Sequence, residues 1–481
     1  MDHDERSLGS DLRSAKDLEL AGRLEEAAEI YRRLASDNPQ NWEVRQRFAR
    51  LSWNRQQRDQ AFAWLGEAIE ISPDQPELHI ERADYLFAMG RLDEAQASIK
   101  IALALAAGEA DFHVKLALVQ LERRDGDGAW AAAQRAIELD PGHKGARQIL
   151  GNLCWQRGEL EAALEHFQIS RTRPNPAPDP NAGFASTLFA LGRTPEIAGL
   201  SKPVINAQNY IETMLRAVYN WQVGRIEPSK NLLQKGGPLF ARSPQAPRMP
   251  IFHQIQQVVA AMVDYLPAHP DFYQTEAEAP LFLVGDNHVL PAAHLTLPFA
   301  ERQRRAIGIL VVSMKAASLV RDDPNAQSAA LLAALDRLPA GADVVLSAGE
   351  LDTRYSDGLL GQLKADGSLT MQEMITPLVR GYLETSARWC RERNLRPAYL
   401  VQPAPNVRLR KIPSFDREPF LAVIACYVDS LRREAAERDL PIIDLYKSTS
   451  APDGGARGEL FIDGNHALPD AYRMAFEKAS A

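Results

Sequence analysis

The sequence predicts a multidomain protein in which an all-α solenoid of helix pairs precedes a three-layer α/β domain built on a parallel sheet. A 34-residue period runs through the first half of the 481-residue chain. Beyond residue 280, short apolar segments alternate with helical patterns, which is the order of elements in a parallel sheet with helices on both faces. Between the two regions, residues 236–250 (GGPLFARSPQAPRMP) are rich in Gly and Pro and break the helical pattern.

Composition excludes several classes of protein. Hydrophobic residues make up 45% of the chain and charged residues 25%, as in ordinary globular proteins. The net charge of −8 argues against nucleic acid as the main partner, because a phosphate-binding surface needs a basic excess. No apolar run approaches the length of a membrane span, and the polar first residues do not form a signal peptide. With three widely spaced cysteines and no CxxC pair, we expect a cytoplasmic protein with reduced thiols.

The period is seen when each position of residues 22–39 (GRLEEAAEIYRRLASDNP) is compared with the positions that follow it at intervals of 34 residues. The turn position holds Gly22, Gln56, Gly90, Arg124, Gly158 and Gly192. The small position holds Ala27, Ala61, Ala95, Ala129, Ala163 and Ile197. The third position holds Pro39, Pro73, Ala107, Pro141 and Asn175. This pattern predicts a tight turn between two closely packed helices, with the second helix ended by a proline.

These units resemble the tetratricopeptide repeat (TPR), a helix–turn–helix unit of 34 residues. The resemblance covers residues 1–235 and includes a seventh, drifted unit with a helix at 209–223 followed by Gly224. Repeats of this kind stack into a curved solenoid with a concave face. The resemblance therefore implies a protein or peptide ligand on that face.

An α/β domain is expected over residues 280–481, after a linker, residues 236–279, that contains one helix at 251–265. The predicted strands are 281–284, 307–313, 343–347, 397–401 and 441–445. The predicted helices include 326–338, 371–393 and 417–437. Strands separated by helices form a parallel sheet, because a parallel connection needs a crossover. The pattern indicates a flavodoxin-like, doubly wound domain.

Polar residues follow the predicted strands at the edge where open α/β sheets bind ligands. GDNH (285–288) follows the first strand, GELDTR (349–354) follows the third, and DGNH (463–466) lies in a loop before the last helix. Asp463 and His466 are three residues apart, so the carboxylate can orient the imidazole. We expect Asn287 and His466 to face each other across one crevice.

Together these segments resemble the SGNH/GDSL family of ester hydrolases and acyltransferases, over roughly residues 280–481. In that family a GDS turn after the first strand carries the nucleophilic Ser, and a Gly and an Asn complete the oxyanion hole. A DxxH motif near the C-terminus supplies an Asp and the general-base His. Gly285 and Asp286 match the opening of the GDS turn, and Asp463 and His466 match DxxH. GELD (349–352) is similar to a GEID variant of the family's third block.

Three of the positions that define the family differ here. Asn287 occupies the nucleophile position, and an imidazole cannot deprotonate an amide at neutral pH. The segment after the second strand (SMKAASLVRDD, 313–323) contains no Gly, and Leu351 replaces the oxyanion-hole Asn without offering a donor. Ser313 and Ser318 in that segment are possible substitute hydroxyls.

The resemblance implies atypical ester chemistry: a carboxylic-ester hydrolase or O-acyltransferase acting on a carbohydrate or similar hydroxylated small molecule. His466 and Asp463 would activate water or an acceptor hydroxyl. The predicted substrate contacts are Asp286, Asn287, His288, Gly349, Glu350, Asp352 and Arg354. The last three charged residues share one side of an extended segment, which also suits an ion-pair network that holds the loop.

The alternative is a catalytically degenerate, SGNH-like binding domain on a TPR adaptor. Neither function calls for a cofactor. A calcineurin-like metallophosphoesterase is excluded because GDNH comes first, GNH is followed by Ala467, and HxH and GHxH motifs are missing from the sequence. No metal is therefore expected.

Overall fold

The structure is a computed structural model that describes most of the chain. The described residues are 2–171, 181–199, 210–242, 250–272, 279–355, 358–365, 367–405, 412–451, 456–462 and 466–480. The chain divides into two compact units, Met1–Leu153 and Cys154–Ala481. Within the described residues, no helix has the length and apolar character needed to cross a membrane.

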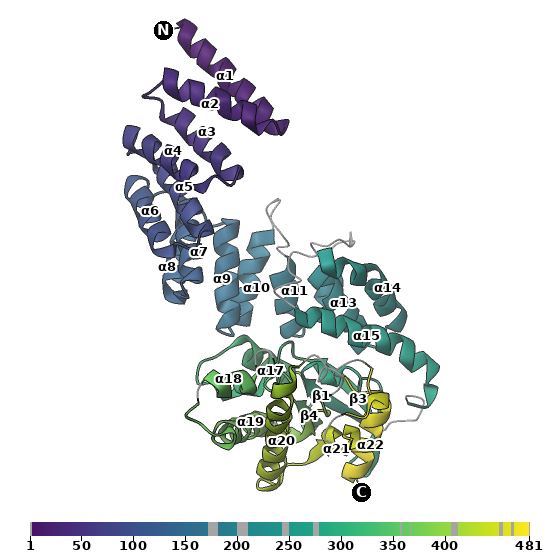
Figure 1. Cartoon of the computed structure of the whole chain (residues 1–481). Coiled ribbons are helices and arrows are strands. Elements are labelled where there is room, and N and C mark those ends of the chain that lie inside the picture. Colours follow the sequence, from purple (N-terminus) through teal and green to yellow (C-terminus); the bar gives the residue numbers. More distant parts are fainter. Residues whose placement is uncertain are drawn as a thin grey trace. The chain divides into compact units, whose positions relative to one another are not determined.

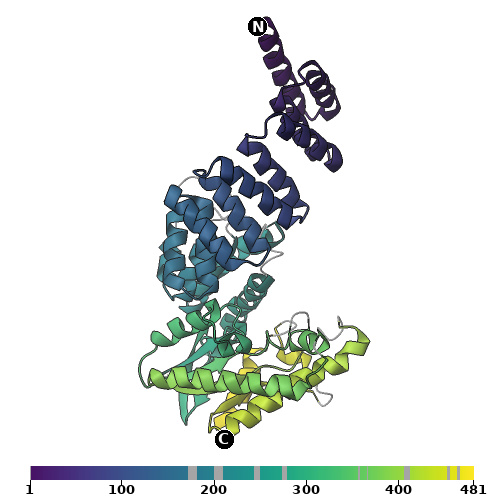
Figure 2. The same cartoon turned by 90° about the vertical axis from the view of Figure 1, so that its left-hand side faces the viewer.

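The first unit consists of antiparallel helix pairs in which each helix packs against the next along the chain (Figures 1 and 2). The helices are α1 (Asp2–Leu20), α2 (Leu24–Asp37), α3 (Trp42–Asn54), α4 (Arg58–Ile71), α5 (Pro76–Ala88), α6 (Leu92–Leu105), α7 (Ala110–Glu122), α8 (Gly126–Leu139) and the start of α9 (Lys144–Gln156). The predicted proline positions 39, 73 and 141 each come two residues after a helix ends.

The turn within each pair keeps one backbone conformation even where glycine is replaced. Gly22 has φ +75°, and Gln56 and Arg124, which occupy the same repeat position, have φ +64° and +62°. At Gln56 the N–H groups of residues 56 and 57 donate to the carbonyls of Trp53 and Ser52 at 3.0 and 2.9 Å. This is the Schellman arrangement that satisfies the last carbonyls of a helix. The repeat therefore requires the left-handed turn itself, and glycine is the residue that adopts it most easily.

The small position of the repeat lies at the closest contact between helices. Ala27, Ala61, Ala95, Ala129 and Ala163 all have 0% exposure. The prediction that a small side chain lets the helices approach is confirmed, because no solvent-accessible space remains at these positions.

The second unit begins with more helices and continues into the α/β domain. The helices are the end of α9, α10 (Leu160–Arg171), α11 (Asn181–Ala190), α12 (Thr194–Gly199), α13 (Tyr210–Gln222), α14 (Ile226–Gly236), η2 (Gly237–Arg242), α15 (Pro250–Ala268) and η3 (Pro270–Phe272). The drifted seventh pair is present as α13 and α14, joined at Gly224 with φ +77°. Helix α15 packs against both.

The sheet has six strands in the order β2-β3-β1-β4-β5-β6. They are β1 (Ala279–Gly285), β2 (Thr296–Phe299), β3 (Arg302–Leu310), β4 (Asp343–Ser347), β5 (Arg396–Val401) and β6 (Ile442–Asp444). All neighbours are parallel except β2 and β3, which form an antiparallel hairpin. The sheet is therefore mixed.

The hairpin corrects two details of the sequence analysis. Strand β2 was not predicted, and β3 runs from Arg302 to Leu310 instead of over 307–313. The hairpin turn uses Ala300 and Glu301 at φ +49° and +61°, without the Gly or Asn that normally marks such a turn. The polar start of β3 also hides the strand, because its side chains alternate between solvent and the interior.

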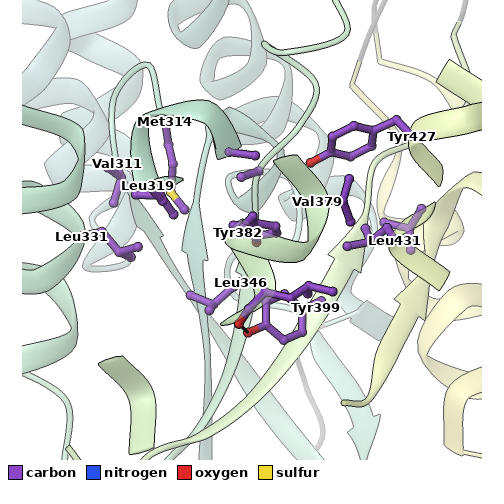
Figure 3. Close-up of a cluster of buried hydrophobic side chains, with 14 of the residues drawn as sticks. Val311, Met314, Leu319, Leu331, Leu346, Val379, Tyr382, Tyr399, Tyr427 and Leu431 are labelled. Atoms are coloured by element: carbon purple, nitrogen blue, oxygen red, sulfur yellow. Dashed lines mark hydrogen bonds between the residues drawn. The ribbon is translucent and has the colours of Figure 1, made fainter. Parts of the chain in front are cut away.

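Helices cover both faces of the sheet. They are α16 (Ala316–Val320), α17 (Ala326–Asp336), α18 (Leu359–Ala365), α19 (Met371–Glu392), α20 (Ser414–Ala436), α21 (Leu445–Thr449) and α22 (Pro469–Ser480), with the short η4 (Asn287–Val289) and η6 (Gly458–Leu460). On one face, side chains of α16, α17, α19 and α20 form a single core with β1, β4 and β5, as Figure 3 shows around Leu346, Tyr382 and Leu431. On the other, α22 contacts both β2 and β6 and so crosses the sheet.

Helix α13 is bonded directly to the α/β domain. The Trp221 indole donates to the carbonyl of Leu290 at 3.3 Å, and the Gln222 amide donates to the carbonyl of Gly308 on β3 at 2.9 Å. His294 Nε2 donates to the carbonyl of Trp221 at 2.5 Å. The last helices before the sheet are thus part of the same packed structure as the sheet.

Replacing Ala95 by Leu tests the close packing of the repeats. The added side chain has no space between the helices, so we expect the free energy of unfolding to fall by about 1–3 kcal/mol. Urea unfolding followed by circular dichroism measures the change. Ala88→Leu, at the exposed end of α5, is the matched control and should change stability little. Equal effects of the two substitutions would contradict this account of the small position.

Candidate functional site

The candidate site lies where the carboxyl ends of β1 and β4 meet the segment before α22. Strand β1 is buried over its last five residues and ends at Gly285. A glycine is needed there, because φ is +158° and a Cβ would lie 2.0 Å from the backbone oxygen of Ser347 on β4. The chain then turns sharply, since the Asp286 side chain accepts a hydrogen bond from the N–H of His288 at 3.2 Å. The turn brings Asp286, Asn287 and His288 to the carboxyl edge of the sheet.

Asn287 and His466 are in direct contact. The Asn287 amide donates from Nδ2 to Nε2 of His466 at 2.7 Å, so this imidazole nitrogen acts as the acceptor. The two side chains are only 2% and 1% exposed. In the part of the chain that the structure describes, Oδ1 of Asn287 has no hydrogen-bond partner. The expected proximity of residues 287 and 466 is therefore observed, in a closed environment.

The second imidazole of the site belongs to His288. Its ring centroid lies 5.0 Å from that of His466, with the ring planes inclined by 39°. The backbone oxygen of His288 accepts a hydrogen bond from the Tyr472 hydroxyl of α22 at 2.5 Å. His288 is fully buried, so the turn after β1 and helix α22 hold its position from two sides.

Asp286 is a buried carboxylate that lies beside neutral groups. Its Oδ1 accepts hydrogen bonds from the Ser347 hydroxyl at 2.8 Å and from the His288 N–H. Its Oδ2 is buried without a hydrogen-bond partner among the described residues. Burial and, to a lesser degree, the charge of Glu350 raise the pKa of Asp286 to about 7, and these hydrogen bonds only partly oppose the rise. The group thus changes charge near neutral pH.

Arg354 keeps the carboxyl group of Glu350 ionised. The guanidinium contacts both carboxylate oxygens, with Nε at 3.0 and 3.1 Å and Nη2 at 2.8 Å. Burial favours the neutral acid, but the charge and hydrogen bonds of Arg354, with smaller effects of His288 and His466, outweigh it and lower the pKa. Nη2 of Arg354 also donates to Oε1 of Gln254 on α15 at 2.9 Å. The predicted pairing of Glu350 with Arg354 is present and extends to a helix outside the sheet. The expectation of an extended segment with three charges on one side was wrong, because residues 350–353 form a turn.

Two other predicted residues of this loop have structural contacts. Gly349 has φ +119°, and a Cβ there would lie 2.5 Å from the Tyr427 hydroxyl. The Asp352 carboxylate accepts hydrogen bonds from the N–H groups of Ala316 and Ala317 at 2.7 and 3.0 Å, so it caps helix α16. Substrate contact by Gly349 or Asp352 stays a prediction.

Other predicted features are placed as follows. Asp463 lies outside the described residues, so its pairing with His466 stays a prediction. Leu351 is buried, and Ser318 lies in α16. Among the described residues, no group of three or more His, Cys, Asp or Glu side chains is arranged to hold a metal ion.

Three further residues shape the site and were not predicted. Ser347 binds Asp286, Tyr472 binds the backbone of His288, and Gln254 binds Arg354. Ser347 could have been found, because it ends a predicted strand at the carboxyl edge. Tyr472 and Gln254 lie within helical patterns and carry no local signal for these contacts.

Comparison with known proteins bears on the helical part of the chain. A family model of the tetratricopeptide repeat matches residues 18–79. With the repeat geometry described above, this shows that the chain contains TPR repeats, which dock peptides or proteins. A search of curated proteins found no match.

Several solved structures are similar to part of the chain. A TPR protein from Parabacteroides merdae is 14% identical, covers 52% of this chain and 99% of its own, and has a TM-score of 0.38. PilF of Pseudomonas aeruginosa is 14% identical, with 47% and 93% covered and a TM-score of 0.36. YrrB, described as a TPR protein with an unusual peptide-binding site, is 16% identical, with 46% and 98% covered and a TM-score of 0.29.

Asp286→Asn tests the charge state of the buried carboxyl. An unfolded Asp titrates near pH 3.9, whereas the folded pKa of Asp286 is about 7. Between about pH 4 and pH 7 the unfolded chain releases a proton that the folded chain retains, so the wild type loses stability as pH rises. The variant, which cannot ionise, should gain up to about 4 kcal/mol relative to wild type over this range. Urea unfolding at four pH values measures the difference, and a difference independent of pH would contradict the assignment.

Proposed function

We propose that this protein is a TPR adaptor whose α/β domain is an SGNH-like binding domain that has lost its nucleophile. The repeats, over residues 1–235, dock a protein or peptide partner, and residues 280–481 form the SGNH-like domain. Residues 236–279 connect the two. The three cysteines are free, and we propose a cytoplasmic location on that basis.

The strand order supports the family resemblance of the α/β domain. Without the hairpin strand β2, the order is β3-β1-β4-β5-β6, which corresponds to the flavodoxin-like order 2-1-3-4-5. The turn after the first strand and the histidine before the last helix meet at the carboxyl edge of this sheet. A hydrolase of the SGNH type would place its nucleophile and base at these two positions.

The observation that carries the proposal is the hydrogen bond from the Asn287 amide to Nε2 of His466. In a hydrolase this nitrogen accepts the proton of a serine hydroxyl as the hydroxyl attacks the ester. Here it is occupied by an amide N–H that cannot be given up at neutral pH. The contact is buried, and the amide offers no hydroxyl that could attack an ester. We therefore propose that the domain binds a ligand and lacks the group that would attack it.

Ester hydrolysis or O-acyl transfer on a carbohydrate or similar hydroxylated molecule is the second candidate. It is favoured by the retained imidazole of His466 at the position of a general base. In that case His466, with Asp463, would activate water or an acceptor hydroxyl once a substrate displaced the Asn287 amide.

Asn287→Ser decides between the two. A serine hydroxyl can donate to His466 and attack an ester, so we expect hydrolysis of p-nitrophenyl acetate to rise about 100-fold over wild type, the scale of general-base catalysis. The gain should disappear in the double variant Asn287→Ser/His466→Ala. Asn287→Ala is the matched control, because it removes the amide without supplying a nucleophile, and it should show no gain.

The remaining outcomes are also informative. Turnover by the wild type that is lost in His466→Ala would favour the second candidate. No turnover by either wild type or Asn287→Ser would contradict the interpretation of this site as a hydrolase site with a replaced nucleophile.

A further inference from the structure

The candidate site is sealed from solvent by its surroundings. Asp286, Asn287, His288 and His466 are between 0% and 2% exposed. The residues that bracket them are also largely covered, since the side chains of Glu350 and Arg354 are each 15% exposed. A ligand could reach the imidazoles only if some neighbouring element moved.

Helices outside the sheet contact both loops that form the site. Helix α13 contacts the segment after β1, through Trp221 to Leu290 and His294 to Trp221. Helix α15 contacts the loop after β4 through Gln254 and Arg354. Two helices that precede the sheet therefore contact the segments that carry the site.

Arg354 is the residue through which α15 contacts the loop after β4. One guanidinium binds Glu350, four residues earlier in the same loop, and Gln254, 100 residues earlier in the chain. The planar guanidinium can hold both partners at once because its N–H groups point in fixed directions. The loop that carries Glu350 begins just after Ser347, whose hydroxyl donates to Asp286 at 2.8 Å in the turn that carries Asn287 and His288.

We propose that Arg354 is a positioning residue that closes the site: it holds Glu350 in the loop after β4 and fastens that loop to α15 through Gln254. Loss of the bond to Gln254 frees the loop from the helix. Loss of Arg354 also removes the guanidinium that contacts both carboxylate oxygens of Glu350, which favours displacement of the loop toward water. The inference rests on the site proposed above but is independent of whether that site performs ester chemistry.

The experiment measures access to the two imidazoles in the full-length protein. Diethyl pyrocarbonate modifies accessible neutral imidazoles, and peptide mass spectrometry gives the rate at each histidine. His269, which is exposed, is the internal reference. His294, which is buried in the contact with α13, reports general unfolding.

In the wild type, His288 and His466 should react far more slowly than His269. Gln254→Ala should raise both rates about tenfold relative to His269, the effect of one hydrogen bond to a charged group on a local opening equilibrium. Arg354→Ala should raise them further. Arg354→Lys, which keeps the charge but loses the fixed geometry, should fall between wild type and Arg354→Ala.

The matched control is Gln257→Ala, an exposed position on the same helix whose amide binds His253. It should leave the rates at His288 and His466 unchanged. Unchanged rates in both Gln254→Ala and Arg354→Ala would overturn the proposal. A parallel rise at His294 would also overturn it, because access would then come from general unfolding. Failure of Asn287→Ser to gain turnover, with protection still lost in Gln254→Ala, would overturn the proposed function and leave the closure intact.

Discussion

The hydrogen bond between the Asn287 amide and the His466 imidazole joins segments that are 179 residues apart. Both groups are removed from water, and a buried polar group without a partner costs about 1–3 kcal/mol, so each stabilises the position of the other. The bond connects the end of β1 to the segment before α22, the helix that crosses the sheet from β2 to β6. An amide and an imidazole thus bind each other at the carboxyl edge of the sheet.

Two buried carboxyl groups beside this bond show how the environment decides charge. Asp286 accepts hydrogen bonds only from the Ser347 hydroxyl and a backbone N–H among the described residues. Burial therefore dominates and its pKa rises to about 7. Glu350 is also buried, but the guanidinium of Arg354 compensates and its pKa falls. The loops after β1 and β4 therefore carry one carboxyl group that a guanidinium keeps ionised and one that titrates near neutral pH.

The repeat region depends on a backbone constraint more than on particular side chains. The left-handed turn persists at Gln56 and Arg124, where the favourable glycine is absent, because the helices on either side must still pack across an alanine with no exposed surface. The strain of a non-glycine residue in that conformation is small compared with the packing that it permits. This explains why the period survives at positions where the sequence itself varies.

The sequence by itself determined the TPR repeats, the buried strands β1, β4 and β5, and the meeting of Asn287 with His466. The repeats and strands follow from short-range patterns. The meeting of Asn287 with His466 was expected from the edge of the sheet where ligands bind and from the resemblance to the SGNH/GDSL family, because His466 precedes a helix and does not end a strand. Only the tertiary structure decided the β2 hairpin, the contact of Ser347 with Asp286, and the hydrogen bonds that link Gln254 to Arg354 and Arg354 to Glu350. The turn at Ala300 lacks the usual turn residues, and Gln254 and Arg354 are 100 residues apart. Periodic patterns in the sequence do not predict which side chains meet when helices pack on a sheet, because these contacts depend on the folded geometry of the helices and the sheet.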